Sequence, residues 1–91
     1  MELKLVNNND LIISLTDLLE FISPFLDKPQ CAHIKECLYH GEESIAFEDM
    51  CSYIDDNDIT ISEQIFNIIE TTGKSMEIDP TTWLLLKNNV L

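Results

Sequence analysis

Apolar residues recur at helical spacing along most of this chain, and that periodicity limits what it can fold into. In the first stretch the apolar positions follow the order i, i+1, i+4, i+7, i+8 and i+11, which places them on one side of a helix. These positions are Leu11, Ile12, Leu15, Leu18, Leu19 and Ile22. We expect Asn9 to cap this helix and Pro24 to interrupt or kink it.

Two further helices are expected in the middle of the chain. Asp27 and Gln30 have capping-box spacing, so a second helix should run to about Tyr39 and stop at Gly41 in a left-handed conformation. Cys31, Ile34 and Leu38 share one face of it. A third helix is expected over residues 42–54. Its inward positions are Ile45, Ala46, Met50, Cys51 and Ile54, with Phe47 and Tyr53 near the margins.

The C-terminal third continues the helical pattern after a polar break at residues 55–58. Ile59 and Ile61 should anchor an extended connector, and Ser62 should cap a fourth helix. Asp79-Pro80 is typical of a helix start, and the last short helix would dock through Trp83 and Leu86. The apolar residues expected on the fourth helix and just after it are Ile65, Phe66, Ile69, Gly73 and Met76.

The sequence therefore predicts an all-α fold, a small bundle of four to five helices in one domain over residues 1–91. With only 2 Gly and 3 Pro, helices joined by short connections are expected. Within the lead-in of residues 1–8, Leu3, Leu5 and Val6 fit either an edge strand or packing against the first helix.

Negative charge is concentrated in one segment. Between Lys35 and Lys74 lie 38 residues without Lys or Arg, of which ten are acidic, and the chain has a net charge of −12. Such a surface repels nucleic acid and anionic membranes, and it attracts a basic surface and speeds association with it. We therefore expect a basic protein as partner, with no nucleic acid and no membrane.

The candidate contact residues follow from charge and expected exposure. Asp55 and Asp56 lie at the expected C-terminal end of the third helix, where the helix dipole disfavours negative charge, so a basic partner would relieve a cost to stability. An ordinary solvated face is the alternative. Aromatic residues are frequent binding anchors, although Trp83 fits the core better than a contact. The candidates are Glu42, Glu43, Glu48, Asp49, Asp55, Asp56, Asp58, Tyr39 and Tyr53.

Metal and catalytic sites receive little support from the sequence. A calcium loop starting at Asp55 would have Thr60 where Gly is needed and Phe66 where Glu is needed. His33, Cys37 and His40 share one helical stripe and carry zinc-binding atoms, but no fourth ligand is evident. No nucleophile motif or Gly-rich loop is present. We expect no metal, no cofactor and no enzymatic activity.

The cellular location is predicted from the N-terminus and the cysteines. Met1-Glu2-Leu3-Lys4 does not begin a secretory signal, and the longest strictly aliphatic runs have three residues, as in Leu84-Leu85-Leu86. Three cysteines are expected to be reduced and buried as small apolar side chains. The sequence therefore predicts a cytoplasmic protein.

A set of residues between about 30 and 87 resembles a known family. The set comprises His40-Gly41-Glu42, Ala46, Cys51, Ile54, Asp58-Ile59-x-Ile61-Ser62, Ile69, Gly73, Met76, Ile78-Asp79-Pro80 and Trp83. In this pattern the chain resembles the MafI-type immunity proteins of bacterial polymorphic-toxin systems, which are related to those of contact-dependent growth inhibition. It departs from the family at Glu77, where a Gly is expected.

This resemblance implies a function. Such proteins are small and cytosolic, and each binds the C-terminal effector domain of one cognate toxin to protect the producing cell. The group is associated with EndoU-type RNase toxins, whose basic RNA-binding surfaces would suit an acidic partner. The contact residues do not follow from the resemblance.

A second resemblance provides an alternative. Glu43-Ser44-Ile45 resembles the Asp-Ser-Leu attachment motif of acyl carrier proteins, and Ile61-Ser62-Glu63 lies about where their Ile-Pro-Asp follows. This resemblance implies phosphopantetheine on Ser44. The Gly-x-Asp context of that motif is absent, and a capped helix is expected to end only a few residues upstream.

Overall fold

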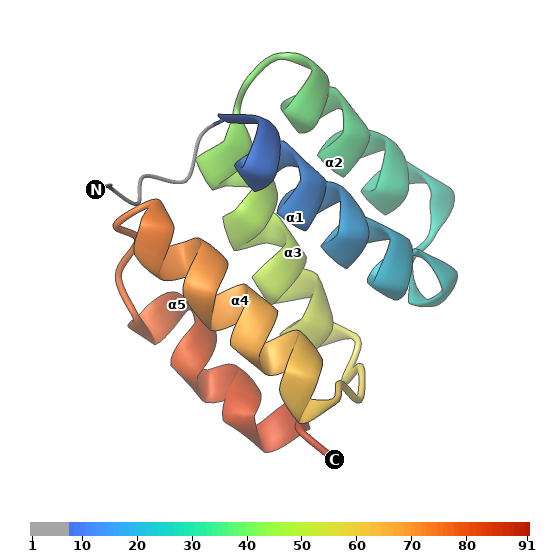
Figure 1. Ribbon diagram of the computed structural model, residues 1–91. Coiled ribbons are helices and arrows are strands. Elements are labelled where there is room, and N and C mark those ends of the chain that lie inside the picture. Colours follow the sequence, from blue (N-terminus) through green and yellow to red (C-terminus); the bar gives the residue numbers. More distant parts are fainter. Residues whose placement is uncertain (1–7) are drawn as a thin grey trace, which may run out of the picture.

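The computed structural model describes residues 8–91, excluding the side chains of residues 8–10, 12 and 13. Within this range the chain forms five α-helices and two 3-10 helices, with no strand (Figure 1). The prediction of an all-α bundle is confirmed. The lead-in residues Leu3, Leu5 and Val6 lie outside the described residues. The elements are α1 (Asn8–Ile22), η1 (Ser23–Phe25), α2 (Lys28–Tyr39), α3 (Glu43–Asp56), α4 (Glu63–Ser75), α5 (Thr81–Leu84) and η2 (Leu85–Asn89).

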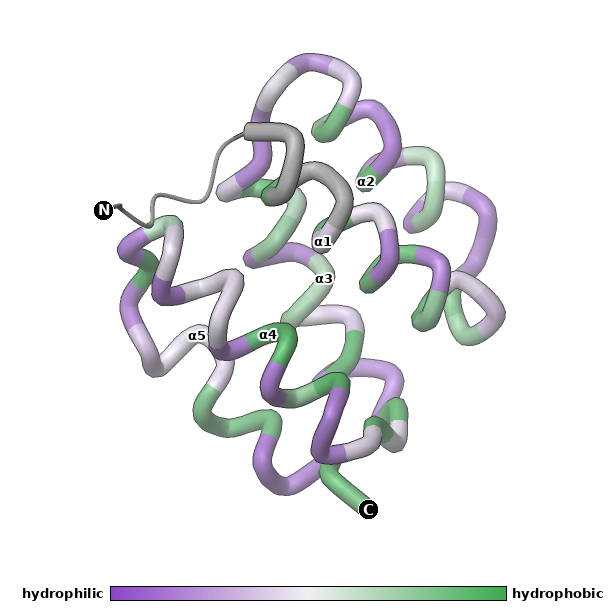
Figure 2. Tube along the Cα trace, viewed as in Figure 1, coloured by the Kyte–Doolittle hydropathy of each residue, from purple (hydrophilic) through white to green (hydrophobic). Residues whose placement is uncertain are grey.

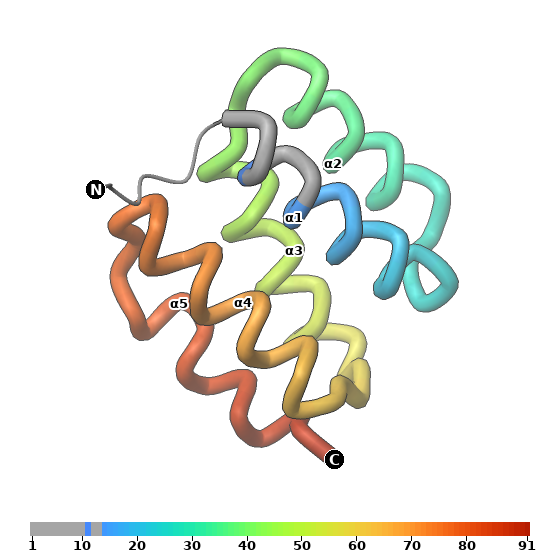
Figure 3. Tube along the Cα trace, in the orientation of Figure 1, coloured from blue at the N-terminus to red at the C-terminus, as the bar shows by residue number. Residues whose placement is uncertain are grey.

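The helices pack side by side with alternating directions. α1 and α3 both end on the side of the bundle where α2 and α4 begin (Figure 3). α3 contacts α1, α2, α5 and η2, whereas α4 contacts α1 and α5. Because α3 is packed against helices from both halves of the chain, one side of it is buried.

Several predicted helix ends are confirmed. The Asp27 carboxylate accepts a hydrogen bond from the Gln30 backbone N–H (2.8 Å), and Gln30 Oε1 accepts one from the Asp27 N–H (3.1 Å). Gly41 has a φ of +73°, the left-handed backbone conformation that often follows the C-terminal end of an α-helix. Ser62 Oγ accepts from the Ile65 N–H (3.1 Å) and starts α4.

The start of the first helix differs from the prediction, whereas its end agrees with it. Asn8 and Asn9 both lie within α1, so the prediction that Asn9 precedes the helix as its cap is wrong. At the other end the helix is interrupted at Pro24, which confirms one of the two predicted effects, and no kinked continuous helix is formed. The chain instead tightens into η1 directly after Ile22, because a proline at the first turn of a 3-10 helix needs no backbone N–H.

The core is a single cluster of side chains from all five helices and the connectors. Figure 2 shows hydrophobic residues recurring along α3 and α4 about once per turn. Phe47 and Trp83 are both 0% exposed and meet edge-on, with ring centroids 6.2 Å apart. The cluster comprises Leu15, Leu18, Leu19, Ile22, Ile34, Cys37, Ala46, Phe47, Met50, Cys51, Ile54, Ile59, Ile61, Phe66, Ile69, Trp83 and Leu86.

The predicted inward face of α3 needs two corrections. Ile45, predicted to be buried, is 44% exposed, and Phe47, predicted at the margin, is fully buried. Two residues apart lie on opposite sides of a helix, so only one of them can face the core. Phe47 does so because it aligns with Met50 and Cys51 and contacts Trp83. The helix begins at Glu43 and continues to Asp56, two residues beyond the predicted end.

The connector after α3 joins the end of the chain. Ile59 and Ile61 are buried, as predicted, and Ile61 forms an isolated parallel bridge with Val90. The Asn89 side chain donates to the carbonyl oxygens of Ile54 (3.2 Å) and Ile59 (3.0 Å). The C-terminal end of α3 is therefore held by the last turn of the chain.

Candidate protein-binding face

One side of α3 is directed away from the core and is predominantly acidic. Residues spaced by three, four and seven positions share a face of a helix. The outer face of α3 consists of Ile45, Glu48, Asp49, Ser52, Asp55 and Asp56, all exposed or half-buried. Four of these six residues are carboxylates and none is a cation. The sequence predicted these carboxylates as contacts, and α3 brings them onto one surface.

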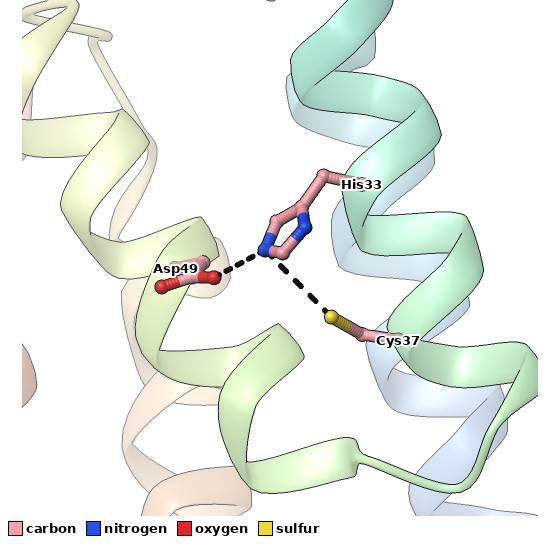
Figure 4. Close-up of polar contacts among 3 residues, drawn as sticks. All are labelled: His33, Cys37 and Asp49. Carbon is pink, nitrogen blue, oxygen red and sulfur yellow. Dashed lines mark hydrogen bonds and ion pairs between the residues drawn. The ribbon is translucent and has the colours of Figure 1, made fainter.

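Asp49 has a partner within the protein. His33 of α2 approaches it across the helix pair, with His33 Nε2 2.6 Å from Asp49 Oδ2 (Figure 4). Both side chains are partly exposed, so the pair links α2 to α3 at the surface. Asp49 is therefore less available to a partner than Glu48, Asp55 and Asp56, which are exposed and have no ion pair among the described residues.

The same histidine lies close to Cys37, but the arrangement is unsuited to nucleophilic catalysis. Cys37 Sγ lies 3.7 Å from His33 Nε2, the nitrogen that also contacts Asp49. One nitrogen cannot accept the thiol proton while donating its own to the carboxylate. Burial raises the pKa of the Cys37 thiol, and the carboxylates of Glu42, Asp49 and Glu36 raise it further. The thiolate is disfavoured as a result.

The structure brings together only two of the three residues His33, Cys37 and His40, which share one helical stripe. His33 and Cys37 meet, but His40 lies 3.9 Å from Glu36 and takes no part in that contact. Across residues 8–91, no group of three or more His, Cys, Asp or Glu side chains is arranged to hold a metal ion.

The C-terminal end of α3 and the turn after it carry three exposed carboxylates, those of Asp55, Asp56 and Asp58. Asp55 and Asp56 form the last turn, with no basic residue there to balance them. Asp58 follows with a φ of +53°, a left-handed conformation that costs a non-glycine residue about 1 kcal/mol. Its N–H donates to the Asp55 carbonyl (3.1 Å), and the Ile59 N–H donates to that of Ile54 (2.9 Å). The backbone N–H groups of Asp58 and Ile59 are therefore hydrogen-bonded, whereas no basic residue in the last turn of α3 balances its carboxylates.

The other predicted contact residues lie at the opposite end of α3. Glu42 occupies the N-cap position without a side-chain capping bond, and Glu43 is half-buried in the first turn. Tyr39, at the end of α2, is 86% exposed and packs edge-on against His40. With 14 residues, α3 separates these groups from Asp56 by about 20 Å at 1.5 Å per residue. The outer face of α3 is what connects the two ends.

The second predicted aromatic anchor is less accessible. Tyr53 is half-buried beside the outer face of α3. Burial raises the pKa of its hydroxyl, and the carboxylates of Asp49 and Asp27 raise it further. Tyr53 therefore lies near acidic groups of both α3 and the start of α2. Trp83 is fully buried, as predicted, so it belongs to the core.

The exposed large apolar side chains include Leu84, Leu85 and Leu91, and two others that the sequence analysis missed lie on α3 or next to its end. Ile45 lies on the outer face of α3, and Phe25 of η1 is 55% exposed. Neither could be found from periodicity, because Ile45 fits the helical stripe and Phe25 follows a proline in a short turn. Ser44, the residue of the carrier-protein alternative, is exposed in the first turn of α3.

Comparison of the chain with known proteins gives no relative from which a function could be transferred. Of the helices in residues 8–91, none combines the length and the apolar character needed to cross a membrane. No family model matches the chain, and no curated protein and no solved structure matches it either.

Proposed function

We propose that this chain is an immunity protein that binds a cognate secreted bacterial toxin and neutralises it. The target would be the toxin's C-terminal nuclease domain, of the EndoU RNase type. The acidic surface would cover the basic active-site or RNA-binding surface of that domain in the cytoplasm of the producing cell. The resemblance over residues 30–87 suggests this class of protein.

One observation carries the proposal, namely the composition of the outer face of α3. Its carboxylates lie on one side of a single helix, without a cation among them, and continue into Asp58. An array of this kind accelerates encounter with a basic protein and disfavours RNA itself. A cytoplasmic inhibitor benefits from fast association, because incoming toxin must be captured before it cuts RNA.

The structure also suggests how the contact would be divided. Glu48, Asp55, Asp56 and Asp58 are exposed and free to meet Lys or Arg side chains. Asp49 would first have to leave His33, from which it is 2.6 Å away. We therefore expect the C-terminal half of α3 to contribute more to association than its N-terminal half.

The test is a charge reversal with a matched control. The probe is a candidate toxin domain, to be sought in the gene immediately upstream. Asp55→Lys/Asp56→Lys/Asp58→Lys should leave the fold intact, slow association with that domain by at least tenfold at low salt, and abolish protection of cells. Asp17→Lys/Glu20→Lys/Glu77→Lys changes the net charge equally at exposed positions elsewhere.

Three outcomes would count against the proposal. These are equal effects of the two triple variants, unchanged protection by the folded first variant, and an association rate that does not respond to added salt.

The carrier-protein alternative has one favourable observation, the exposure of Ser44 at a helix start. Incubation with coenzyme A and a phosphopantetheinyl transferase distinguishes the two functions. A gain of the phosphopantetheine mass on Ser44, absent from Ser44→Ala, would favour a carrier protein. An unchanged mass together with toxin binding would favour the immunity protein.

A further inference from the structure

Phe25 is an exposed aromatic side chain at the acidic end of α3. It belongs to η1, the turn between α1 and α2, and is 55% exposed. Asn57, the residue after α3, donates a long hydrogen bond (3.4 Å) from its side chain to the Phe25 carbonyl. Segments 32 residues apart in sequence are thereby joined, and Phe25 lies next to the turn that carries Asp56 and Asp58.

The backbone around Phe25 is held in place before any partner arrives. Pro24 fixes its own φ at the start of η1, and the Leu26 N–H donates to the Ser23 carbonyl (3.1 Å). Cys31 Sγ lies 3.8 Å from the same carbonyl, and the ring of Phe25 is 6.5 Å from that of Phe21. A side chain on so constrained a turn loses little conformational freedom on binding.

The surroundings of Phe25 are acidic. Asp27 lies two residues beyond it, and Asp56 and Asp58 flank the Asn57 that binds its carbonyl. All three are exposed, and Lys28 is the one cation in these two short segments, residues 25–28 and 55–58. A single exposed apolar residue is common on protein surfaces. An exposed aromatic residue on a turn whose neighbouring residues are acidic has a more specific complement, which is an apolar pocket bordered by Lys or Arg.

From this arrangement we infer that Phe25 is the apolar anchor of the toxin contact, inserted into a base-binding pocket of the nuclease's RNA groove. The inference rests on the proposed function. An RNA-binding groove offers apolar or aromatic surfaces for bases next to cations for phosphates. Phe25 would take the place of a base, and Asp56 and Asp58 would take the place of phosphates.

Kinetics separate this role from electrostatic steering. Truncating a buried aromatic anchor increases the dissociation rate, whereas removing charges at the rim mainly slows association. With the same candidate toxin domain as the probe, Phe25→Ser should raise Kd about tenfold or more through faster dissociation, nearly independently of salt. Leu84→Ser is the matched control, since Leu84 is a similarly exposed (42%) apolar residue of α5. It should leave Kd unchanged.

Two measurements guard against a folding defect in the variant. Phe25→Leu keeps the apolar contact with Phe21 and should restore much of the affinity. In the unmodified protein, the NMR signals of the Phe25 ring should shift on adding the toxin domain, and an excess of single-stranded RNA oligonucleotide should reverse the shift.

The outcomes distinguish the inference from the function on which it rests. If the unmodified chain does not bind the toxin domain, both fail. If it binds and the Asp55/Asp56/Asp58 reversal weakens binding, but folded Phe25→Ser does not, the inference fails and the function stands. Ring signals that stay unshifted in the complex would also overturn the inference. A concentration-dependent dimer that Phe25→Ser abolishes would also overturn the inference, because Phe25 would then contact a second copy of this chain and not the toxin domain.

Discussion

Helices α3 and α4 have similar lengths and similar backbone conformations after their C-terminal ends, yet they differ in capping and in the charged residues at their ends. Two residues after the end of each helix lies an acidic residue with positive φ, Asp58 (+53°) after α3 and Glu77 (+57°) after α4. α4 starts with a Ser62 cap and has Lys74 in its last turn. α3 starts at Glu42 without a side-chain capping bond and ends in two aspartates with no basic residue.

The difference in capping and end charges indicates that the ends of α4 favour helix stability, whereas those of α3 do not. In α4, the capping bond and the basic last turn agree with the helix dipole. In α3, the buried face is well packed, and the unfavourable features are confined to exposed residues at its two ends. A protein retains residues that lower stability most readily where they serve another purpose. This contrast is the physical reason for proposing α3 as the partner-binding helix.

The largest effect is expected where α4 packs most closely. A Cβ added at Gly73 would lie 2.4 Å from Cζ3 and 2.5 Å from Cε3 of Trp83. Gly73→Ala should therefore lower the free energy of unfolding by about 2 kcal/mol. In an exposed helix interior the same change would raise it by about 1 kcal/mol. Urea unfolding followed by circular dichroism measures the difference, and a stabilised Gly73→Ala variant would contradict this packing.

A smaller effect should distinguish the two helix ends. Asp58→Gly and Glu77→Gly should each raise the free energy of unfolding by about 1 kcal/mol, because glycine adopts positive φ without the steric cost. The two variants should then differ in function. Asp58→Gly should also weaken binding to the toxin domain, whereas Glu77→Gly should not. Equal binding by both variants would remove Asp58 from the contact.

The smallest effect on stability is expected for Asp79, whose carboxylate accepts two hydrogen bonds from Thr81. Hydrogen bonds from the Thr81 backbone N–H and hydroxyl (both 3.0 Å) lower the pKa of its carboxyl below the usual 3.8. The ionised carboxylate therefore stabilises the fold at pH values above 3.8, and this contribution is lost as the pH falls through the lowered pKa.

Denaturant unfolding of Asp79→Asn tests this linkage. The variant should be less stable than the unmodified chain at pH 7, and the difference should shrink in acid. Thr81→Val removes only the hydroxyl donor and should give an intermediate result. A difference that is the same at pH 7 and in acid would rule out the carboxylate as its source.

Local sequence chemistry predicted much of the fold. The Asp27–Gln30 capping box, the Gly41 terminus and the Ser62 cap each depend on residues a few positions apart, so each could be read without tertiary information. The docking of Trp83 and Leu86 followed from their apolar character and spacing. Asn9 was misassigned because residues that cap helices are also tolerated in the first turn of one.

The candidate site was less predictable. Sequence identified the carboxylates, but it did not show that His33 engages Asp49, since the two residues are on different helices. Phe25 gave no periodic signal, and its position beside Asn57 depends on how η1 packs against the end of α3.

The sequence by itself determined the helical class, most helix ends and the concentration of negative charge, because these depend on short-range spacing and composition. The sequence also placed Ala46, Met50, Cys51 and Ile54 on the buried side of α3, but only the tertiary structure decided whether Ile45 or Phe47 joins them. Ile45 and Phe47 are both apolar, and the choice between them depended on the Trp83 ring, which arrives from a helix 36 residues later in the chain than Phe47. That choice places Ile45 and the carboxylates on the outside, where a partner could reach them.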